Sequence, residues 1–330
     1  MGQITRRGVV AGALVVPFAG RIAGAQGSWP AGAGVIRIIV PFPAGGSVDA
    51  VARLVQAGMQ QRLGTTVLVE NQPGSSGAAA TGRVAKAAPD GSNWVFVFDT
   101  HAVNPAMQQL SFDTARDLEP VMLIGTAPNV LATHPSKPFR SVADVIAAAK
   151  AKPDTITYAT IGTGSLGHLT MVRFRKETGT KLTHVPYRGG GPAMNDALAG
   201  HVDLIIGSAA LINPQLESKS LVPLVQFGGS RIASPSLKDV PTAGEGGLPG
   251  LESYAWWGVF APAKTPKSMI DRFGQDLKAS LADERALRVL KDTQQIEIRA
   301  SGPEELQRFL ETEMKVWGAV VRENNIKADS

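Results

Sequence analysis

Two glycine-rich segments of this 330-residue chain combine residue types that suit anion binding. The first is Ala44-Gly45-Gly46-Ser47, and the second runs from Thr160 through Thr163 and Gly164 to Ser165. Glycine lets the backbone approach a ligand closely, and Ser and Thr add short hydroxyl donors. If each segment opens a helix, its unpaired N–H groups and partial positive charge favour a carboxylate. For either segment alone, an ordinary tight turn capped by Ser47 or a similar residue is the competing interpretation.

The second segment also matches two catalytic patterns, each incompletely. Gly162-x-Gly164-x-x-Gly167 has dinucleotide-binding spacing, but the next expected strand ends at His184-Val185-Pro186 without an acid for the ribose. Thr163 to Gly167 resembles a nucleophile elbow around Ser165, but Thr163 replaces the first glycine and His168 has no Asp partner placed for it. We therefore expect no catalytic residue and no cofactor, and a secreted esterase is the least favoured reading.

Asp99 and His101 follow the expected strand 94–98, where pocket residues of α/β sheets lie. Asp99 could pair with an ammonium group of a ligand, although a solvated or Arg-paired loop acid explains it equally well. The chain has no cysteine, and its five histidines show no spacing typical of a metal site. We expect no metal.

The elements that must position these residues are two α/β blocks. Runs of β-branched and aromatic residues alternate with helical periodicity and Gly-rich turns, which is typical of doubly wound sheets. In the first block we expect strands at 35–40, 66–70, 94–98 and within 120–130, with helices at 48–63 and 78–88. In the second we expect strands at 155–160, 181–185, 202–206 and 221–227, with helices at 169–178 and 193–200. A third Gly-rich turn, 188–192, precedes the last of these helices.

The last part of the chain is expected to be mostly helical, at 268–281, 284–293 and 303–323. If this tail packs back on the first block, that lobe is discontinuous in sequence. Trp256-Trp257, on the way back from the second block, is expected to pack in the core or at a hinge.

The N-terminus predicts export. Arg6-Arg7 precedes an apolar run from Val9 to Phe18, and Ala23-Gly24-Ala25 follows as a cleavage site. We expect residues 1–25 to be a twin-arginine signal peptide and the mature protein to be periplasmic. Removing them leaves 30 basic and 28 acidic residues. That small excess without a basic stripe argues against nucleic-acid binding.

The chain resembles the Bug-type receptors, the substrate-binding family of the tripartite tricarboxylate transporters. The resemblance is carried in order by several segments: 41–49 (PFPAGGSVD), 69–74 (VENQPG), 88–91 (APDG), 100–105 (THAVNP), 184–189 (HVPYRG) and 239–242 (DVPT). It implies a type II periplasmic-binding-protein fold, with two α/β lobes that close on a ligand. Lobe one would be residues 35–129 plus 253–330, and lobe two residues 130–252.

The resemblance also implies a set of ligand-binding residues, since family members hold carboxylates at the two turns with help from ordered waters. With Asp99 added, the expected set is Phe42, Ala44, Gly45, Gly46, Ser47, Asp99, His101, Asn104, Thr160, Thr163, Gly164, Ser165 and Asp203. Two positions depart from the family pattern. Gly207-Ser208 stand where an Asp-Asn pair is common, and Asp99 stands where a small polar residue is usual.

These inferences predict a non-enzymatic, monomeric periplasmic receptor that captures a small carboxylate and delivers it to integral membrane transporter subunits. A receptor that serves as the input of a sensor kinase remains the alternative. Asp99 leads us to expect a ligand with a positive or donor group, such as an amino acid or a nitrogen-heterocycle acid.

Overall fold

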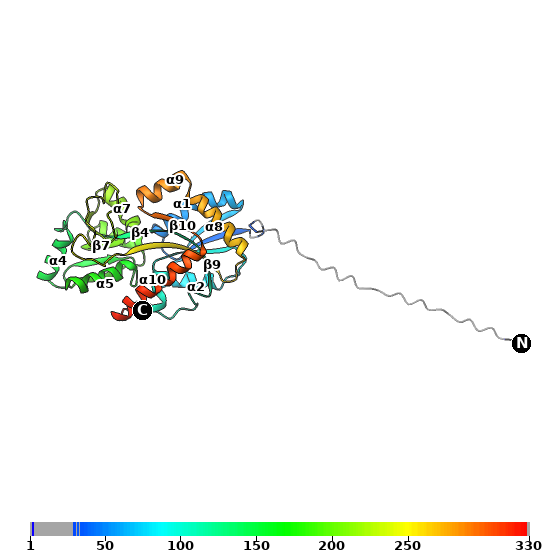
Figure 1. Ribbon diagram of the computed structural model, residues 1–330, viewed down its shortest axis with the longest axis horizontal. Coiled ribbons are helices and arrows are strands. Elements are labelled where there is room, and N and C mark those ends of the chain that lie inside the picture. The colour runs from blue at the N-terminus through cyan, green and yellow to red at the C-terminus, as the bar shows by residue number, and fades with distance from the viewer. Residues whose placement is uncertain (1, 3–28, 31, 33, 329–330) are drawn as a thin grey trace.

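The computed structural model describes residues 2, 29, 30, 32 and 34–328. The expected signal peptide therefore lies almost wholly outside the described residues. Within the described part, no helix combines the length and the apolar composition needed to cross a membrane. The molecule has two lobes, both visible in Figure 1, with the second lobe in green and the first in blue and orange to red.

The first lobe begins with the alternation that the sequence predicts. Its elements are β1 (Val35–Val40), α1 (Ser47–Leu63), β2 (Thr66–Asn71), the short 3₁₀ turn η2 (Ser75–Gly77), α2 (Ala78–Ala85), β3 (Asn93–Phe98) and α3 (Thr100–Met107). Strand β1 pairs in parallel with β2 on one side and with β3 on the other. Helix α3 follows β3 almost directly, so Asp99 is the residue that joins them.

The second lobe repeats the pattern. After β4 (Leu118–Thr133) come α4 (Val142–Ala151), β5 (Thr157–Thr160), α5 (Leu166–Thr178), β6 (Thr183–Pro186), α6 (Gly190–Leu198), β7 (Leu204–Ser208), α7 (Ala209–Glu217) and β8 (Val222–Gln226). Strand β5 pairs in parallel with β6 and with β7. The carboxyl ends of β5 and β7 thus face the same edge of this half of the sheet.

The chain then returns to the first lobe. It forms β9 (Tyr254–Pro262), α8 (Lys267–Leu281), α9 (Glu284–Arg288), the π-helical turn η3 (Val289–Thr293), β10 (Glu297–Ser301) and α10 (Pro303–Glu323). Helix α8 packs on α1, and α10 packs on α3. The tail therefore covers the first lobe, as its helical pattern allowed.

One long antiparallel strand, β4, joins the two halves of the sheet (Figure 1). Its first part, Leu118–Pro128, pairs with β9, and its last part, Asn129–Thr133, pairs with β7. The strand order is β2-β1-β3-β9-β4-β7-β5-β6, with β8 and β10 also bonded to β4. The parallel sheets predicted from sequence are thus present in each lobe, but antiparallel β4 and β9 connect them.

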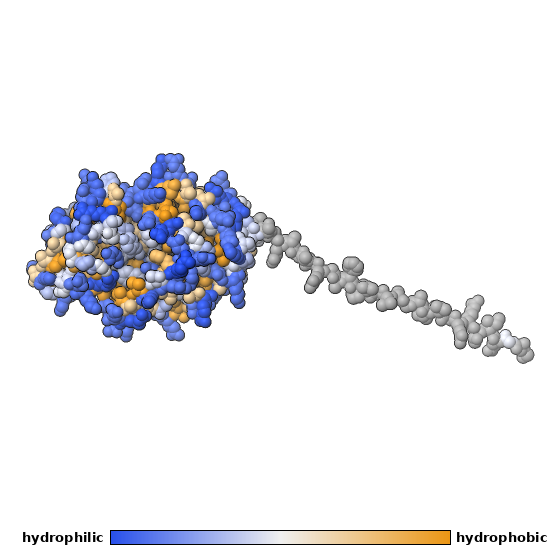
Figure 2. Space-filling view, viewed as in Figure 1, coloured by the Kyte–Doolittle hydropathy of each residue, from blue (hydrophilic) through white to orange (hydrophobic). Residues whose placement is uncertain are grey.

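The core of the molecule is built on β9 and its neighbours. Trp256 and Trp257 on this strand are buried, which confirms the expected core packing of this pair. Trp257 packs edge-on against Phe98, with ring centroids 5.2 Å apart. Phe98 also lines the space between the lobes, so the core packs directly against one wall of that space. The outer surface seen in Figure 2 is mostly hydrophilic, with smaller apolar areas between.

Candidate functional site

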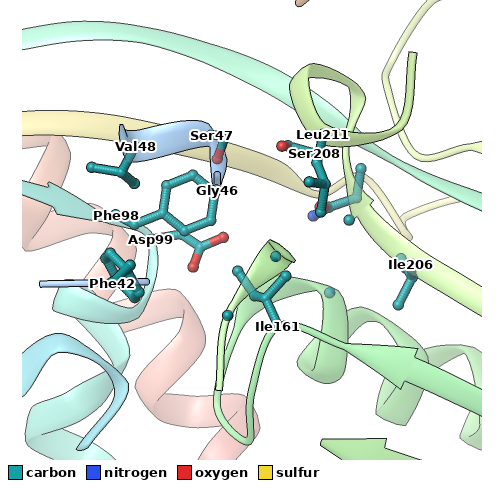
Figure 3. Close-up of a pocket in the computed structure, with 15 residues that line it drawn as sticks. Phe42, Gly46, Ser47, Val48, Phe98, Asp99, Ile161, Ile206, Ser208 and Leu211 are labelled. Atoms are coloured by element: carbon teal, nitrogen blue, oxygen red, sulfur yellow. The ribbon is translucent and has the colours of Figure 1, made fainter. Parts of the chain in front are cut away.

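A pocket lies between the lobes, at the point where the carboxyl ends of strands from both halves meet. The space between its atoms, counting the part open to solvent, is about 450 Å³, but the room for the centre of a water molecule is only about 20 Å³. The structure describes these lining residues: Phe42, Gly46, Ser47, Val48, Phe98, Asp99, Asn129, Ile161, Gly167, Gly189, Gly190, Ile206, Gly207, Ser208 and Leu211. Figure 3 shows the carboxyl group of Asp99 directed into the space between Gly46 and Ile161. Four of the expected residues are brought together here: Phe42, Gly46, Ser47 and Asp99.

The first turn contributes backbone to the pocket. Gly46 is the N-cap of α1 with extended backbone, and Ser47 is the first residue of the helix, so the competing interpretation, in which Ser47 caps the helix, is wrong. Gly45 and Ala44 are exposed and do not line the pocket. The N–H of Gly45 donates to Asp49 Oδ2 at 2.9 Å, so this donor is used inside the turn.

Asp49 holds the first turn in shape through three donors. Besides Gly45, the side chains of Arg53 and Asn71 each donate to its Oδ1 at 2.9 Å. Burial alone would raise the pKa of Asp49, but these hydrogen bonds and the Arg53 charge outweigh it and leave the pKa below its usual value. Asp49 is therefore charged and serves to fix the loop that carries Gly46 and Ser47.

In the second turn, the hydroxyls of Thr160 and Ser165 are used in hydrogen bonds within the second lobe. Ser165 is the buried N-cap of α5, and its Oγ donates to the carbonyl of Gly162 at 2.8 Å. Thr160 Oγ1 lies 2.7 Å from His184 Nε2. Gly164 adopts a positive φ of 82°, and its N–H donates to His168 Nδ1 at 3.2 Å. Of this region, Ile161 and Gly167 reach the pocket, whereas Thr160, Gly164 and Ser165 shape it from behind.

The second turn does not have the arrangement of Ser165 and His168 that the esterase hypothesis requires. The Ser165 hydroxyl bonds to backbone, and the ring of His168 accepts the Gly164 N–H and stacks on His184 with centroids 4.0 Å apart. Burial, with smaller contributions from His184 and Arg175, lowers the pKa of His168 to about 3. A ring with this pKa and these partners is a poor general base for Ser165.

His101 and Asn104 lie behind the pocket, in a separate small cavity lined also by Ser76 and Thr81. Burial lowers the pKa of His101 to about 3, so its ring is neutral and packs on Phe260. The amide of Asn104 donates to the Ser76 carbonyl at 3.1 Å. Asn104 therefore holds η2 against α3, and neither residue offers a charge to a ligand.

Asp203 lies at the wrong end of its strand for a cleft residue. It precedes β7, whereas Ser208 at the carboxyl end of β7 lines the pocket. Lys137 Nζ donates to its Oδ1 at 2.8 Å, and the backbone N–H of Thr157 donates to Oδ2 at 2.9 Å. Burial would raise the pKa of Asp203, but these partners outweigh it and lower the pKa. Asp203 thus forms a structural ion pair with Lys137. The expectation that it lies near the cleft is wrong.

Several pocket residues were not expected. Gly189 and Gly190 belong to the third Gly-rich turn, which opens α6 as the same strand-to-helix rule would have indicated. Ser208 is the N-cap of α7. Asn129 lies in the last third of β4, where that strand begins to pair with β7, and Leu211 lies in the first turn of α7. The first turns of α1, α6 and α7 therefore all face the pocket, each with backbone N–H groups at its start.

The lobes touch around this pocket. A Cβ on Gly189 would lie 2.8 Å from Pro43 Cδ, and a Cβ on Gly190 would lie 3.7 Å from Gly46 Cα. Ser76 Oγ of the first lobe donates to the Thr163 carbonyl of the second at 3.3 Å. The structure is thus a closed form, in which glycine lets the two turns meet. In the part of the chain that the structure describes, no cluster of His, Asp or Glu suits a metal ion.

The fold and this interlobe pocket define a two-lobe solute-binding protein. The model of the tripartite tricarboxylate transporter family receptor matches residues 51–326, and the chain belongs to that family. A UPF0065 protein from the tcbD-tcbE intergenic region of Pseudomonas sp. strain P51 is 33% identical over 100% of this chain and 97% of its own length.

Two solved structures are similar along nearly the whole chain. The periplasmic binding protein BugD is 29% identical, with a TM-score of 0.84 over 89% of this chain and 99% of its own. R. palustris Rpa4515, solved with adipate, is 31% identical, with a TM-score of 0.85 over 91% of this chain and 100% of its own. These findings confirm the expected Bug-type family and the two-lobe periplasmic-binding-protein fold.

Proposed function

We propose that this chain is a periplasmic receptor that closes two lobes on a small carboxylate-bearing ligand and delivers it to the membrane subunits of a tripartite transporter. One observation carries the proposal: the first turns of α1, α6 and α7, from both lobes, face a single pocket. Their backbone N–H groups and aligned dipoles suit an anion that bridges the lobes. Adipate, the ligand of the similar R. palustris protein, is a carboxylate of this kind.

Lobe closure would act about the crossing segments. We place the lobes at residues 35–129 plus 253–330 and at residues 130–252, with the hinge at Asn129 and Ser253. The N–H of Asn129 donates to the Ser253 carbonyl at 3.0 Å, and Asn129 Nδ2 donates to Ser253 Oγ at 2.7 Å. A pair of neighbouring strands fixed in this way is a suitable axis for hinge motion.

The proposal includes export by the twin-arginine signal and action as a monomer. The BugD relative is described as periplasmic, which agrees with that location. A receptor of this kind captures its ligand in the periplasm, so the membrane subunits would be its protein partner.

A thermal-shift screen of the mature chain tests the binding step. The panel would hold dicarboxylates, tricarboxylates, aromatic acids and amino acids, with the matching uncharged amides as controls. A ligand at 100 times its dissociation constant should add about 2.7 kcal/mol to the free energy of unfolding. That corresponds to a rise of a few degrees in Tm for a chain of this size. Equal shifts by acids and by their amides, or no shift by any acid, would contradict carboxylate capture.

A further inference from the structure

Asp99 is the one acidic or basic side chain among the 15 lining residues that the structure describes. It is only 1% exposed, and its Oδ1 has no hydrogen-bond partner. Figure 3 shows the carboxyl group turned toward the middle of the pocket. Buried polar atoms are normally hydrogen-bonded, so this oxygen requires a donor that the described part of the chain does not provide.

The surroundings of Asp99 supply no cation to pair with it. The backbone N–H groups of Leu166 and Thr100 lie near the carboxyl group and favour the charged form. Burial, together with the Glu313 carboxylate, outweighs them, so the pKa of Asp99 lies well above its usual value. No Lys, Arg or His stands among the described lining residues. The group therefore lacks a cation that would compensate its burial.

The rest of the pocket separates into two kinds of surface. The first turns of α1, α6 and α7 present backbone donors suited to a carboxylate. Phe42, Val48, Ile161, Ile206 and Leu211 present apolar surface. Ser208 Oγ, buried and without a partner, adds one further hydroxyl. A ligand that satisfies all these groups needs an anion, a short apolar body and a donor for Asp99.

We propose that the ligand carries a protonated nitrogen as well as a carboxylate, and that Asp99 binds the nitrogen and selects for it. This inference rests on the proposed carboxylate receptor and names its substrate class. The carboxylate binds at the helix starts, and the N–H donates to Asp99 Oδ1. Two opposite charges held in one closed space then each have a partner, which a plain diacid cannot achieve beside Asp99.

Matched ligand pairs that differ by one amino group test the inference. The pairs are succinate and aspartate, glutarate and glutamate, and 3-phenylpropanoate and phenylalanine. Affinities are measured by calorimetry at pH 7.5 for the wild-type chain and for Asp99→Asn, which keeps the size of the side chain. Asp203→Asn makes the same chemical change at the Lys137 ion pair, away from the pocket, and serves as the control.

For the wild-type chain we expect the amino member of at least one pair to bind about tenfold or more tightly than its partner. Asp99→Asn should abolish that preference, mainly by weakening the amino ligand, and Asp203→Asn should keep it. Tighter binding of the amine-free acids by the wild-type chain would overturn the inference and leave the carboxylate receptor standing. Binding of neither class, with folding verified by circular dichroism, would overturn both.

A pH series separates the remaining possibility, that a protonated Asp99 donates to a ligand carboxylate. In that case the affinity for succinate or glutarate would fall as the pH rises from 5 to 8, and Asp99→Asn, whose amide can donate, would restore it. Such a result would overturn the inference. A rise in the affinity for the amino acid over the same range would support it.

Discussion

Asn129 and Ser253 are joined by two hydrogen bonds, one between their backbones and one between their side chains, although 124 positions separate them in the sequence. Both residues are about 1% exposed. They lie where the chain passes from the first lobe to the second and where it returns. Asn129 also lines the pocket, so the crossing point and the binding site share a residue.

Ser253→Ala should destabilise the chain, because it leaves the buried Nδ2 of Asn129 without its acceptor. We expect the free energy of unfolding to fall by roughly 1–3 kcal/mol in urea denaturation. The control is Ser230→Ala, an exposed serine in the same return segment, which should stay within about 0.5 kcal/mol of wild type. Equal behaviour of the two variants would mean that the Asn129 amide is satisfied in another way.

Gly189→Ala should weaken ligand binding, because the added Cβ would meet Pro43 of the opposite lobe at 2.8 Å. We expect a loss of roughly 1–3 kcal/mol in binding free energy for the tightest acid of the panel. Gly189 also has a positive φ of 129°, so the variant carries backbone strain as well.

Gly179→Ala is a control for adding a Cβ at a glycine of positive φ where no clash follows. Gly179 ends α5 with φ of 64° and has no atom within 4 Å of the added Cβ. It should lose about 1 kcal/mol of stability and no affinity. A larger radius of gyration for Gly189→Ala in solution scattering would show that closure is what has been blocked. If both glycine variants bind as wild type, the contact between Gly189 and Pro43 does not limit closure.

Asp203→Asn should lower stability without changing affinity. The wild-type carboxylate accepts from Lys137 and Thr157, and its pKa is lowered in the folded state. Its stabilising effect is therefore present above the ordinary pKa of 3.8 and is lost as the pH falls through the lower folded value. We expect the variant to be less stable by about 1–3 kcal/mol at pH 7, with the difference shrinking at pH 3. A change in ligand affinity would contradict the placement of Asp203 away from the pocket.

Glu313→Gln should stabilise the chain at alkaline pH. Burial raises the pKa of Glu313 from 4.5 to about 7, although Trp317 Nε1 donates to its Oε2. Charging it therefore costs stability as the pH rises from 4.5 through 7. The variant should exceed the wild type by about 1–3 kcal/mol at pH 8 and match it near pH 4.5 in denaturant titrations. Glu311→Gln, an exposed change on the same helix, should show no such crossover.

Local patterns were sufficient to predict most strands and helices. Val35–Val40 and Asn93–Phe98 are runs of β-branched or aromatic residues next to Gly-rich turns, and they form β1 and β3 as expected. Helix α3 was missed because Asn104 and Pro105 lie inside it, and both disfavour helix interiors. Strand β10 was missed because Glu297–Ser301 is short and half polar, and its pairing with β4 decides its structure.

The pocket residues on strand-to-helix turns could be predicted from the sequence. Those that reach the pocket only through the pairing of distant strands could not. Gly46 and Ser47 were expected because a strand-to-helix turn can be recognised locally. Asn129 gave no local signal, since only the crossing of β4 brings it to the pocket. Asp203 was misplaced because the resemblance gave its position in the chain but not which end of β7 faces the ligand.

Strand β9 has a consequence for the order in which the molecule can assemble. It lies between β3 and β4 in the sheet, yet it is made from residues 254–262. Until that segment is available, β3 and β4 have no strand between them to pair with. Aromatic side chains of the first lobe such as Phe98 also lack the residues of β9 against which they pack. A chain that ends before residue 254 would therefore lack a complete first lobe, although it contains all of the second. It would have an opening through the middle of its sheet, and synthesis of the second lobe must be finished before the first can become stable.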